Sequence, residues 1–265
     1  MNENNKTDYE RNKKNYGEYW SSRFRRTYSY SLQTKLKRFR YILKKSGLIN
    51  KKNLNVFDYG FGLGKMLFLF DKSCLLYGVE LSEITVKQIT SEANRLGYVS
   101  MDFRVYDKNK PILPVEWKEK FDIVIASHVL EHFANPKMVL YELVKTMSTN
   151  GYACLIVPVN ELPGEDLNHF TNFTNSSFLE LLSETELLPI KIELCDCIWD
   201  IISPLAMKRQ RKDSGILHAI SICINLFTSF LPFCALQLAD VILKYFGFKE
   251  RQMFVLCKHK SKKYD

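Results

Sequence analysis

Asn55-Val56-Phe57-Asp58-Tyr59-Gly60-Phe61-Gly62-Leu63-Gly64 decides the fold, because an apolar run passes directly into a turn that contains three glycines. We predict a buried strand over residues 54–58 and a helix over residues 63–72. Alternate glycines let the backbone bend sharply and approach a ligand where a Cβ would collide. The free N–H groups at the start of the following helix would face the same ligand. The stretch therefore predicts a ligand site at the end of the first strand of an α/β sheet.

A second strand that ends in a carboxylate indicates which ligands to consider. The run Leu75-Leu76-Tyr77-Gly78-Val79-Glu80 places Glu80 where it can accept hydrogen bonds from both hydroxyls of a ribose. Dinucleotides and S-adenosylmethionine are both bound in this way. Lys65 stands where a dinucleotide site needs a glycine, and Asp58 would repel a pyrophosphate. A carboxylate at this position suits a ligand that carries an ammonium and a sulfonium.

Three motifs together resemble the class I S-adenosylmethionine-dependent methyltransferases of the small-molecule type, similar to the type 11/23 group. They are residues 57–64, residues 78–82 and the segment Phe121-Asp122-Ile123-Val124-Ile125-Ala126-Ser127-His128-Val129-Leu130-Glu131-His132. The resemblance covers residues 50–195 and a closing strand near residues 252–258. It implies a doubly wound, mostly parallel seven-stranded α/β sheet, the Rossmann-like methyltransferase fold, and an enzyme that uses S-adenosylmethionine.

The resemblance also implies which residues bind the cofactor. The first motif would contact the methionine part, Glu80 the ribose, and Asp107 the adenine. Asp107 is followed by Lys108 rather than by an apolar residue, which departs from the family pattern. The full expected set is Asp58, Tyr59, Gly60, Phe61, Gly62, Gly64, Glu80, Leu81, Asp107, Ser127 and His128.

Methyl transfer to a hydroxyl requires alignment of the acceptor and removal of its proton. We expect His169 to be the general base, with His128 as the second choice. The loop after the fifth strand and the third motif would bind the acceptor through Glu131, His132, Asn160, His169 and Phe170. Some relatives bind a divalent cation through a Glu-x-x-Glu-His group and a later histidine. Here His128 replaces the first glutamate, so we predict no metal and keep a metal site as the alternative.

The alternation of strands and helices predicts the course of the chain. Strands are expected at 54–58, 75–79, 101–106, 121–126, 152–157, 190–195 and 253–257, and helices at 30–47, 63–72, 83–96, 136–148 and 176–184. We divide the chain into a basic N-terminal helical cap (1–50) and a methyltransferase domain (51–260), within which residues 200–248 form an apolar helical insertion before the last strand. The helix at 30–47 would cover the cofactor edge. Tyr16, Tyr19 and Trp20 would close over the cofactor or pack in the core.

The segment 216–246 is rich in large apolar residues, yet His218, Asn225, Pro232 and Gln237 interrupt it. Two helices joined at Pro232 are therefore expected rather than a membrane span. They would form a lid, a homodimer face or a peripheral membrane contact.

Charge and cysteine content bound the remaining alternatives. The net charge is +9, and residues 1–52 hold 15 Lys and Arg against 4 Asp and Glu. This basic region suits nucleic acid, an anionic membrane or a phosphorylated substrate, or it is a solvated helix face. The seven cysteines lie mostly in apolar runs without metal-ligand spacing. Together with the polar N-terminus they favour a cytoplasmic protein, with membrane association as an alternative.

We therefore expect an S-adenosylmethionine-dependent methyltransferase that acts, at oxygen, on a small-molecule or glycan-precursor acceptor. Nucleic acid is not the favoured partner. One alternative is an RNA methyltransferase that uses the basic N-terminal region, whose RNA binding would weaken with added salt. The other is a non-catalytic scaffold that binds the cofactor or a membrane.

Overall fold

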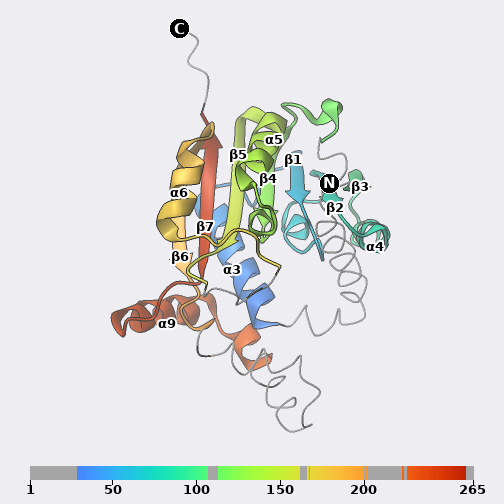
Figure 1. Cartoon of the computed structure of the whole chain (residues 1–265). Coiled ribbons are helices and arrows are strands. Elements are labelled where there is room, and N and C mark those ends of the chain that lie inside the picture. The colour runs from blue at the N-terminus through green and yellow to red at the C-terminus, as the bar shows by residue number, and fades with distance from the viewer. Residues whose placement is uncertain are drawn as a thin grey trace.

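The computed structural model describes residues 29–106, 113–161, 166, 168–199, 201, 223 and 226–260. Its centre is a seven-stranded sheet with the order β3-β2-β1-β4-β5-β7-β6 (Figure 1). The strands are β1 (Asn55–Tyr59), β2 (Leu75–Glu80), β3 (Met101–Val105), β4 (Phe121–Ser127), β5 (Met147–Pro158), β6 (Leu187–Cys195) and β7 (Gln252–His259). All neighbouring pairs are parallel except those that involve β7. The doubly wound, mostly parallel α/β fold predicted from the sequence is confirmed.

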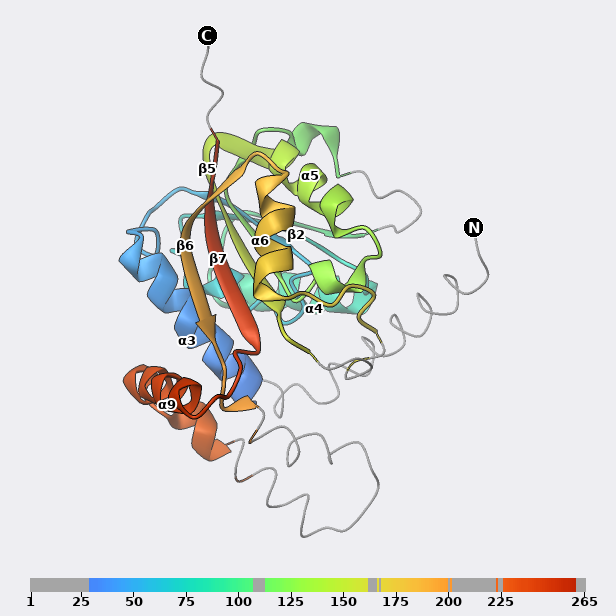
Figure 2. The same ribbon diagram turned by 60° about the vertical axis from the view of Figure 1, so that its left-hand side comes forward.

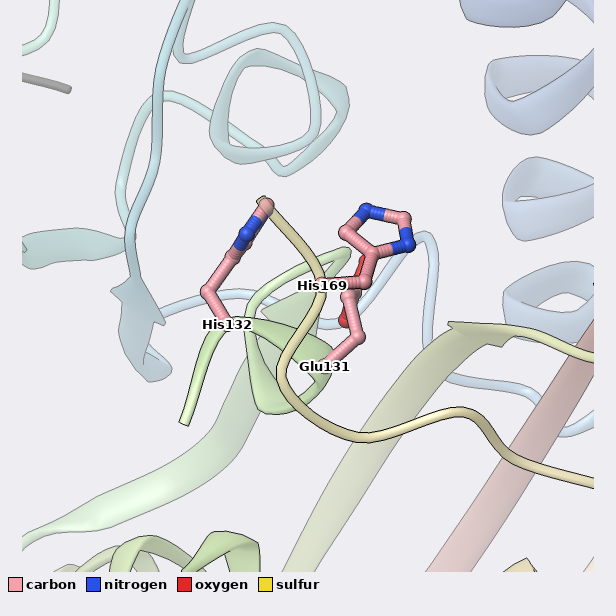
Figure 3. A group of neighbouring side chains, drawn as sticks. All are labelled: Glu131, His132 and His169. Atoms are coloured by element: carbon pink, nitrogen blue, oxygen red, sulfur yellow. The ribbon is translucent and has the colours of Figure 1, made fainter. Parts of the chain in front are cut away.

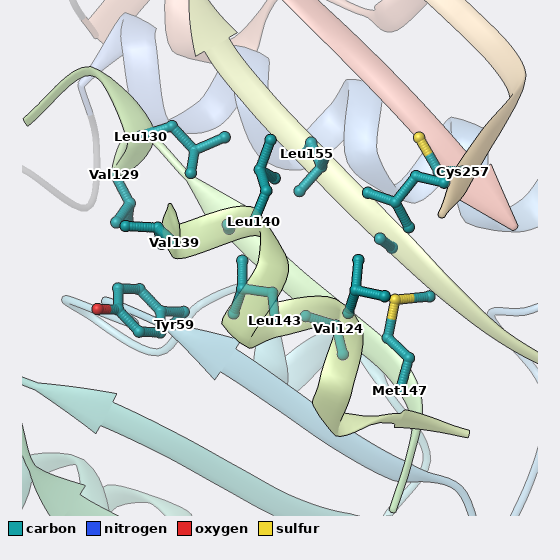
Figure 4. Close-up of a cluster of buried hydrophobic side chains, with 14 of the residues drawn as sticks. Tyr59, Val124, Val129, Leu130, Val139, Leu140, Leu143, Met147, Leu155 and Cys257 are labelled. Carbon is teal, nitrogen blue, oxygen red and sulfur yellow. The ribbon is translucent and has the colours of Figure 1, made fainter. Parts of the chain in front are cut away.

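Helices cover both faces of the sheet. On one face, α3 (Tyr30–Lys45) and α4 (Glu83–Arg95) bury their apolar stripes, with Phe39 and Ile42 of α3 packed in one cluster with Ile125 and Phe254. On the other face lie α5 (Pro136–Thr146) and α6 (Asn175–Ser183). Figure 4 shows side chains of α5 directed toward those of β4 and β5. The helix predicted at residues 30–47, which was expected to cover the cofactor edge, is α3, and it packs against the sheet as part of the core.

The prediction of a helix at residues 63–72 is wrong. The structure has only a single 3-10 turn, η1 (Leu67–Leu69), in this stretch. Gly60, Gly62 and Gly64 all have positive φ, at 73°, 50° and 63°, and such residues do not continue a right-handed helix. Met66, Leu67 and Phe70 in this stretch are nevertheless buried.

A second boundary also differs from the prediction. The helix expected at 136–148 ends at Thr146, and the strand expected at 152–157 begins already at Met147, so that Gly151 lies within β5. The pairing of β4 with β5 shifts register between Phe121 and Ile123. A Cβ on Gly151 would lie 2.8 Å from the carbonyl oxygen of Phe121, so glycine permits this close approach of the two strands.

The last helix, α9 (Phe233–Tyr245), begins directly after Pro232, as expected for a helix that proline starts. It lies beside α3 at one end of the sheet (Figure 2). Buried Arg38 of α3 pairs with Glu193 of β6, at 2.7 Å, and with Asp240 of α9. This ion triad therefore ties three elements together that are far apart in the sequence.

We predict that Arg38→Met lowers the free energy of unfolding by about 3–5 kcal/mol, because it leaves two largely buried carboxylates without their cation. Urea unfolding of both proteins measures the change. The control is Lys87→Ala, which removes an exposed ion pair with Glu83 and should cost less than about 0.5 kcal/mol. Equal small effects of the two substitutions would contradict a structural role for the triad.

Candidate functional site

The glycine turn lies at the carboxyl end of β1 and packs against two neighbouring segments. A Cβ on Gly60 would lie 2.7 Å from a methyl group of Val129, which follows β4. A Cβ on Gly78 of β2 would lie 2.4 Å from the ring of Phe61. Both glycines are therefore required for this packing, and the side chain of Phe61 is buried beneath β2 at 6% exposure.

Glu80 is fixed by the backbone of the glycine turn. One carboxylate oxygen accepts a hydrogen bond from the amide of Gly62, at 2.9 Å, and the other accepts from the amide of Leu81, at 2.7 Å. The amide of Gly62 thus orients the side chain that was expected to bind the ribose. The sequence had predicted that the free N–H groups at the start of a helix would face the ligand. In the structure, the amide of Gly62 in the turn instead binds Glu80.

Asp58 and Glu80 form a pair of buried carboxylates at the ends of adjacent strands, each at 3% exposure. Burial raises the pKa of Asp58 well above its usual range, and the charge of Glu80 raises it further. Burial also raises the pKa of Glu80, against hydrogen bonds from Gly62, Leu81 and Ser82 that lower it. Among the described residues, no cationic side chain contributes to the pKa shift of either carboxylate. The pair therefore fits a ligand that brings its own positive charge.

Other residues expected to bind the cofactor differ in their placement. Tyr59 is buried in the main core and packs edge to face on Tyr106, with 5.4 Å between ring centroids. Ser127 ends β4 and is partly exposed, and Leu81 packs partly buried at the core margin. Asp107 lies outside the described residues.

A pocket of about 200 Å³ lies at the same edge of the sheet. Its walls come from the start of α3, the segments that follow β4, β5 and β6, and the start of β7. The lining residues are Ser31, Lys35, His128, Pro158, Glu161, Asp166, His169, Asp196, Trp199, Arg251 and Gln252. Both predicted catalytic histidines therefore line one cavity. The glycine turn does not line it, but Val129, the neighbour of His128, packs on Gly60 of that turn.

His169 is oriented by a carboxylate. Its Nδ1 lies 2.7 Å from an oxygen of Glu161, and its Nε2 lies 3.6 Å from an oxygen of Asp166. Burial alone lowers the pKa of His169, but the hydrogen bond and charge of Glu161, with the charges of Glu131 and Asp166, raise it above its ordinary value. Because an ionised carboxylate only accepts, Nδ1 carries the proton and Nε2 is the basic atom in the neutral ring.

His128 is the other pocket histidine, and its backbone has a positive φ of 54°, which is strained for a residue with a Cβ. Burial and the nearby charge of Lys35 lower its pKa. Its Nδ1 lies 3.3 Å from Glu131, which is fully buried. Burial raises the pKa of Glu131, but His128 and His132 outweigh it and hold the pKa below its usual range.

Glu131, His132 and His169 are neighbours, and Figure 3 shows the carboxylate beneath the ring of His169. One potential ligand atom from each lies within 4.8 Å of the others. The Nδ1 of His132 lies 3.1 Å from the carbonyl oxygen of Asn168, so its Nε2 is available as a ligand. These three residues could hold a divalent transition metal, which is the alternative to the metal-free pocket predicted from the sequence.

Four of the five predicted acceptor residues do not line the pocket: Glu131, His132, Asn160 and Phe170. The side-chain amide of Asn160 donates to the carbonyl of Glu250, at 3.0 Å, so it fastens the loop after β5 to the start of β7. The side chain of Phe170 is exposed at 49%.

Sequence reasoning missed other pocket residues. Lys35 and Ser31 lie one helical turn apart on α3 and line the pocket. The sequence analysis treated this helix as a basic segment that packs on the core and did not place its side chains in the pocket. Burial lowers the pKa of Lys35, against the charges of Glu131 and Asp196. Asp196 follows the carboxyl end of β6, and the sheet-edge rule that selected Ser127 would have found it. Burial raises its pKa to about 6.

The chain matches the family described as "Methyltransferase domain" over residues 50–199, which is more than half of its length. A search of curated proteins finds no match. Similar solved structures include a protein from Galdieria sulphuraria assigned as a sarcosine dimethylglycine methyltransferase, at 12% identity, with a TM-score of 0.59 over 86% of this chain and 85% of that chain.

Two further similar structures were solved with S-adenosyl-L-homocysteine bound. One is magnesium protoporphyrin IX methyltransferase from Synechocystis, at 14% identity, with a TM-score of 0.52 over 86% of this chain and 83% of that one. The other is geranyl diphosphate C-methyltransferase from Streptomyces coelicolor, at 13% identity, with a TM-score of 0.52 over 83% and 74%. At these identities the likeness concerns the fold.

We predict that Glu161→Gln lowers the pKa of His169, because it removes the hydrogen-bonded charge that raises it. NMR titration of the ring measures the pKa. The folded pKa is raised, so the pair stabilises the protein fully below the unfolded value of about 6.5 and loses this effect as pH rises through the folded value. The variant should therefore lose more stability on the acidic side of that pKa than on the alkaline side. An unchanged pKa would contradict the pairing, and Asp166→Asn, at the longer distance, should have the smaller effect.

Proposed function

The chain belongs to the methyltransferase-domain family, and from this premise we propose that it transfers the methyl group of S-adenosylmethionine to an oxygen of a small-molecule or glycan-precursor acceptor. It is an S-adenosylmethionine-dependent enzyme of the Rossmann-like fold. The observation that carries the choice of reaction is the pair His169 and Glu161 in the pocket at the carboxyl edge of the sheet, the edge that also carries the glycine turn. A base at this place suits an acceptor that must lose a proton.

The residues of the donor site have separate tasks. Glu80, held by the amides of Gly62 and Leu81, presents its oxygens to the ribose hydroxyls. Asp58 offers negative charge to the methionine part. When bound, the cofactor supplies an electrophilic methyl group on a sulfonium. The buried carboxylates gain a counter-charge at the same time, which offsets the cost of their burial.

The residues of the pocket hold the acceptor and its proton. The Nε2 of His169 accepts the proton of the acceptor hydroxyl, while Nδ1–H donates to Glu161, whose charge stabilises the imidazolium that forms. His128 is the alternative base, although its lowered pKa makes it the weaker one. Lys35 and Arg251 on the pocket wall suit an acceptor with an anionic or strongly polar group.

A small acceptor is supported by the size of the pocket. At about 200 Å³ it is below the usual range for drug-sized ligands, so it suits a compact molecule or the end of a longer one. The similar structures named above are described with dimethylglycine, a magnesium porphyrin and geranyl diphosphate as substrates, all of them small molecules. RNA is the second candidate because exposed Arg40, Lys44 and Lys45 extend the basic N-terminal region.

We predict that labelled methyl groups from S-adenosylmethionine appear in the small-molecule or lipid fraction of a cell extract incubated with the protein. His169→Ala should bind the cofactor as the wild type does and lose most of the transfer, about 100-fold or more, because only the base is removed. Gly62→Arg should lose both. Isothermal titration and the label count measure these two quantities.

Three results would contradict this proposal. Label in the RNA fraction, lost at raised salt, would favour the RNA alternative. Cofactor binding without transfer to any fraction would favour the non-catalytic scaffold. Full transfer by His169→Ala would show that His169 is not the general base.

We also predict that affinity for S-adenosylmethionine falls as pH is lowered through the raised pKa values of Asp58 and Glu80. Because burial raises the pKa of both carboxylates, they take up protons at higher pH than ordinary carboxylates and then lose the charge that binds a cationic ligand. Affinity is thus full above these pKa values and is lost below them. Titration calorimetry at a series of pH values measures it, with exposed Glu83→Gln as a control that should follow the wild type. Affinity that is constant or increases toward acid would contradict the assignment.

A further inference from the structure

Helix α9 has an inverted pattern, because its solvent-facing side is apolar. Leu236 and Asp240 face inward and are buried. The opposite side carries Cys234, Leu238, Val241, Ile242 and Tyr245, all of them exposed. These five residues recur at the three- and four-residue spacing of one helix face, which we call the α9 face. An ordinary surface helix would have polar residues there.

Aromatic side chains continue this apolar surface along the chain. Phe227 and Phe230, in the helical residues 226–230 before Pro232, are exposed at 71% and 73%. Tyr245 and Phe246 at the end of α9 are exposed at 87% and 70%. Single exposed apolar residues are common on proteins, but several exposed aromatic and aliphatic side chains within one short segment mark an interaction surface.

Positive charge surrounds the start of α9. The ring of Phe233 lies 4.8 Å from that of Tyr41, and Tyr41 in turn has the ammonium groups of Lys45 and Lys191 at 5.8 Å and 4.6 Å from its centroid. Lys244 lies on α9 itself, where its ammonium group pairs with Glu250 at 2.9 Å. In the sequence, the apolar segment is also preceded by Lys208-Arg209-Gln210-Arg211-Lys212, which lies outside the described residues. An apolar, aromatic helix beside basic residues matches the surface of an anionic bilayer.

We propose that the α9 face, with Phe227 and Phe230, docks this protein on the surface of an anionic phospholipid bilayer. Among the described residues no helix is long and apolar enough to cross a bilayer, so α9 would lie in the plane of the interface. A second copy fits less well, since the basic residues that border α9 would meet their own like charges.

The docking surface is fixed relative to the pocket. Leu236 of α9 packs with Tyr30, Leu231 and Trp199 in a small cluster, and Trp199 lines the pocket. Asp240 pairs with Arg38 of α3, the helix that also carries Lys35 into the pocket. A protein held by α9 would therefore keep its pocket at one orientation to the membrane.

Vesicle co-sedimentation tests the proposal. The full chain is mixed with vesicles of phosphatidylcholine containing about 30% phosphatidylglycerol, and with vesicles of phosphatidylcholine alone. We expect binding to the anionic vesicles that weakens with added salt. The double variant Val241→Asp with Tyr245→Asp should bind at least about tenfold less, because it places charge on the apolar face. Val99→Asp, at an exposed apolar residue outside the α9 face, is the matched control and should bind like the wild type.

The remaining outcomes overturn the proposal. Absence of vesicle binding by the wild type, or equal binding by the double variant, excludes the α9 face as a membrane surface. A wild-type dimer in light scattering that the double variant dissociates would make a second copy the occupant. Loss of thermal stability in the double variant without vesicle binding by the wild type would make α9 part of the core. Cofactor titration on the same samples is independent, so vesicle binding without cofactor binding would overturn the proposed function alone.

Discussion

The structure depends on the burial of two carboxylates beside one another. Asp58 pairs in register with Gly78. Glu80, two residues further along β2, therefore lies at the same edge of the sheet. Two such groups in a place of low dielectric repel each other, and burial raises the pKa of both. The glycine turn makes the arrangement tolerable, because the amide of Gly62 donates to Glu80. A bound ligand with a positive charge would stabilise the two carboxylates, so this edge of the sheet is the candidate cofactor site.

The sequence predicted the sheet well because its strands are short apolar runs with clear ends. The order of motifs placed Asp58, Glu80 and Ser127 at one edge, since the carboxyl ends of parallel strands always meet there. The helix at residues 63–72 was mispredicted, because a glycine turn after a strand was taken to open a helix, and the sequence does not reveal that Gly62 and Gly64 adopt left-handed backbone conformations. Local pattern determined the strands, whereas backbone geometry determined the turn.

The acceptor pocket was predicted only in part, for a physical reason. Its walls come from α3, the loops after β4, β5 and β6, and the start of β7, which meet only through the tertiary fold. His128 and His169 were found because histidine after a strand is a chemical signal. Lys35 and Arg251 were not, because a basic residue on a helix or before a strand is common on any surface. Substrate choice depends on such residues, and the fold does not determine it.

The most direct test of this account is isothermal titration of S-adenosylmethionine into the wild type and into Glu80→Ala. We expect one binding site in the wild type and an affinity at least about tenfold lower in the variant, because the ribose loses its charged acceptor. Circular dichroism should be the same for both proteins. Wild-type protein that does not bind, or a variant that binds equally well, would contradict the claim that the buried carboxylates form the cofactor site.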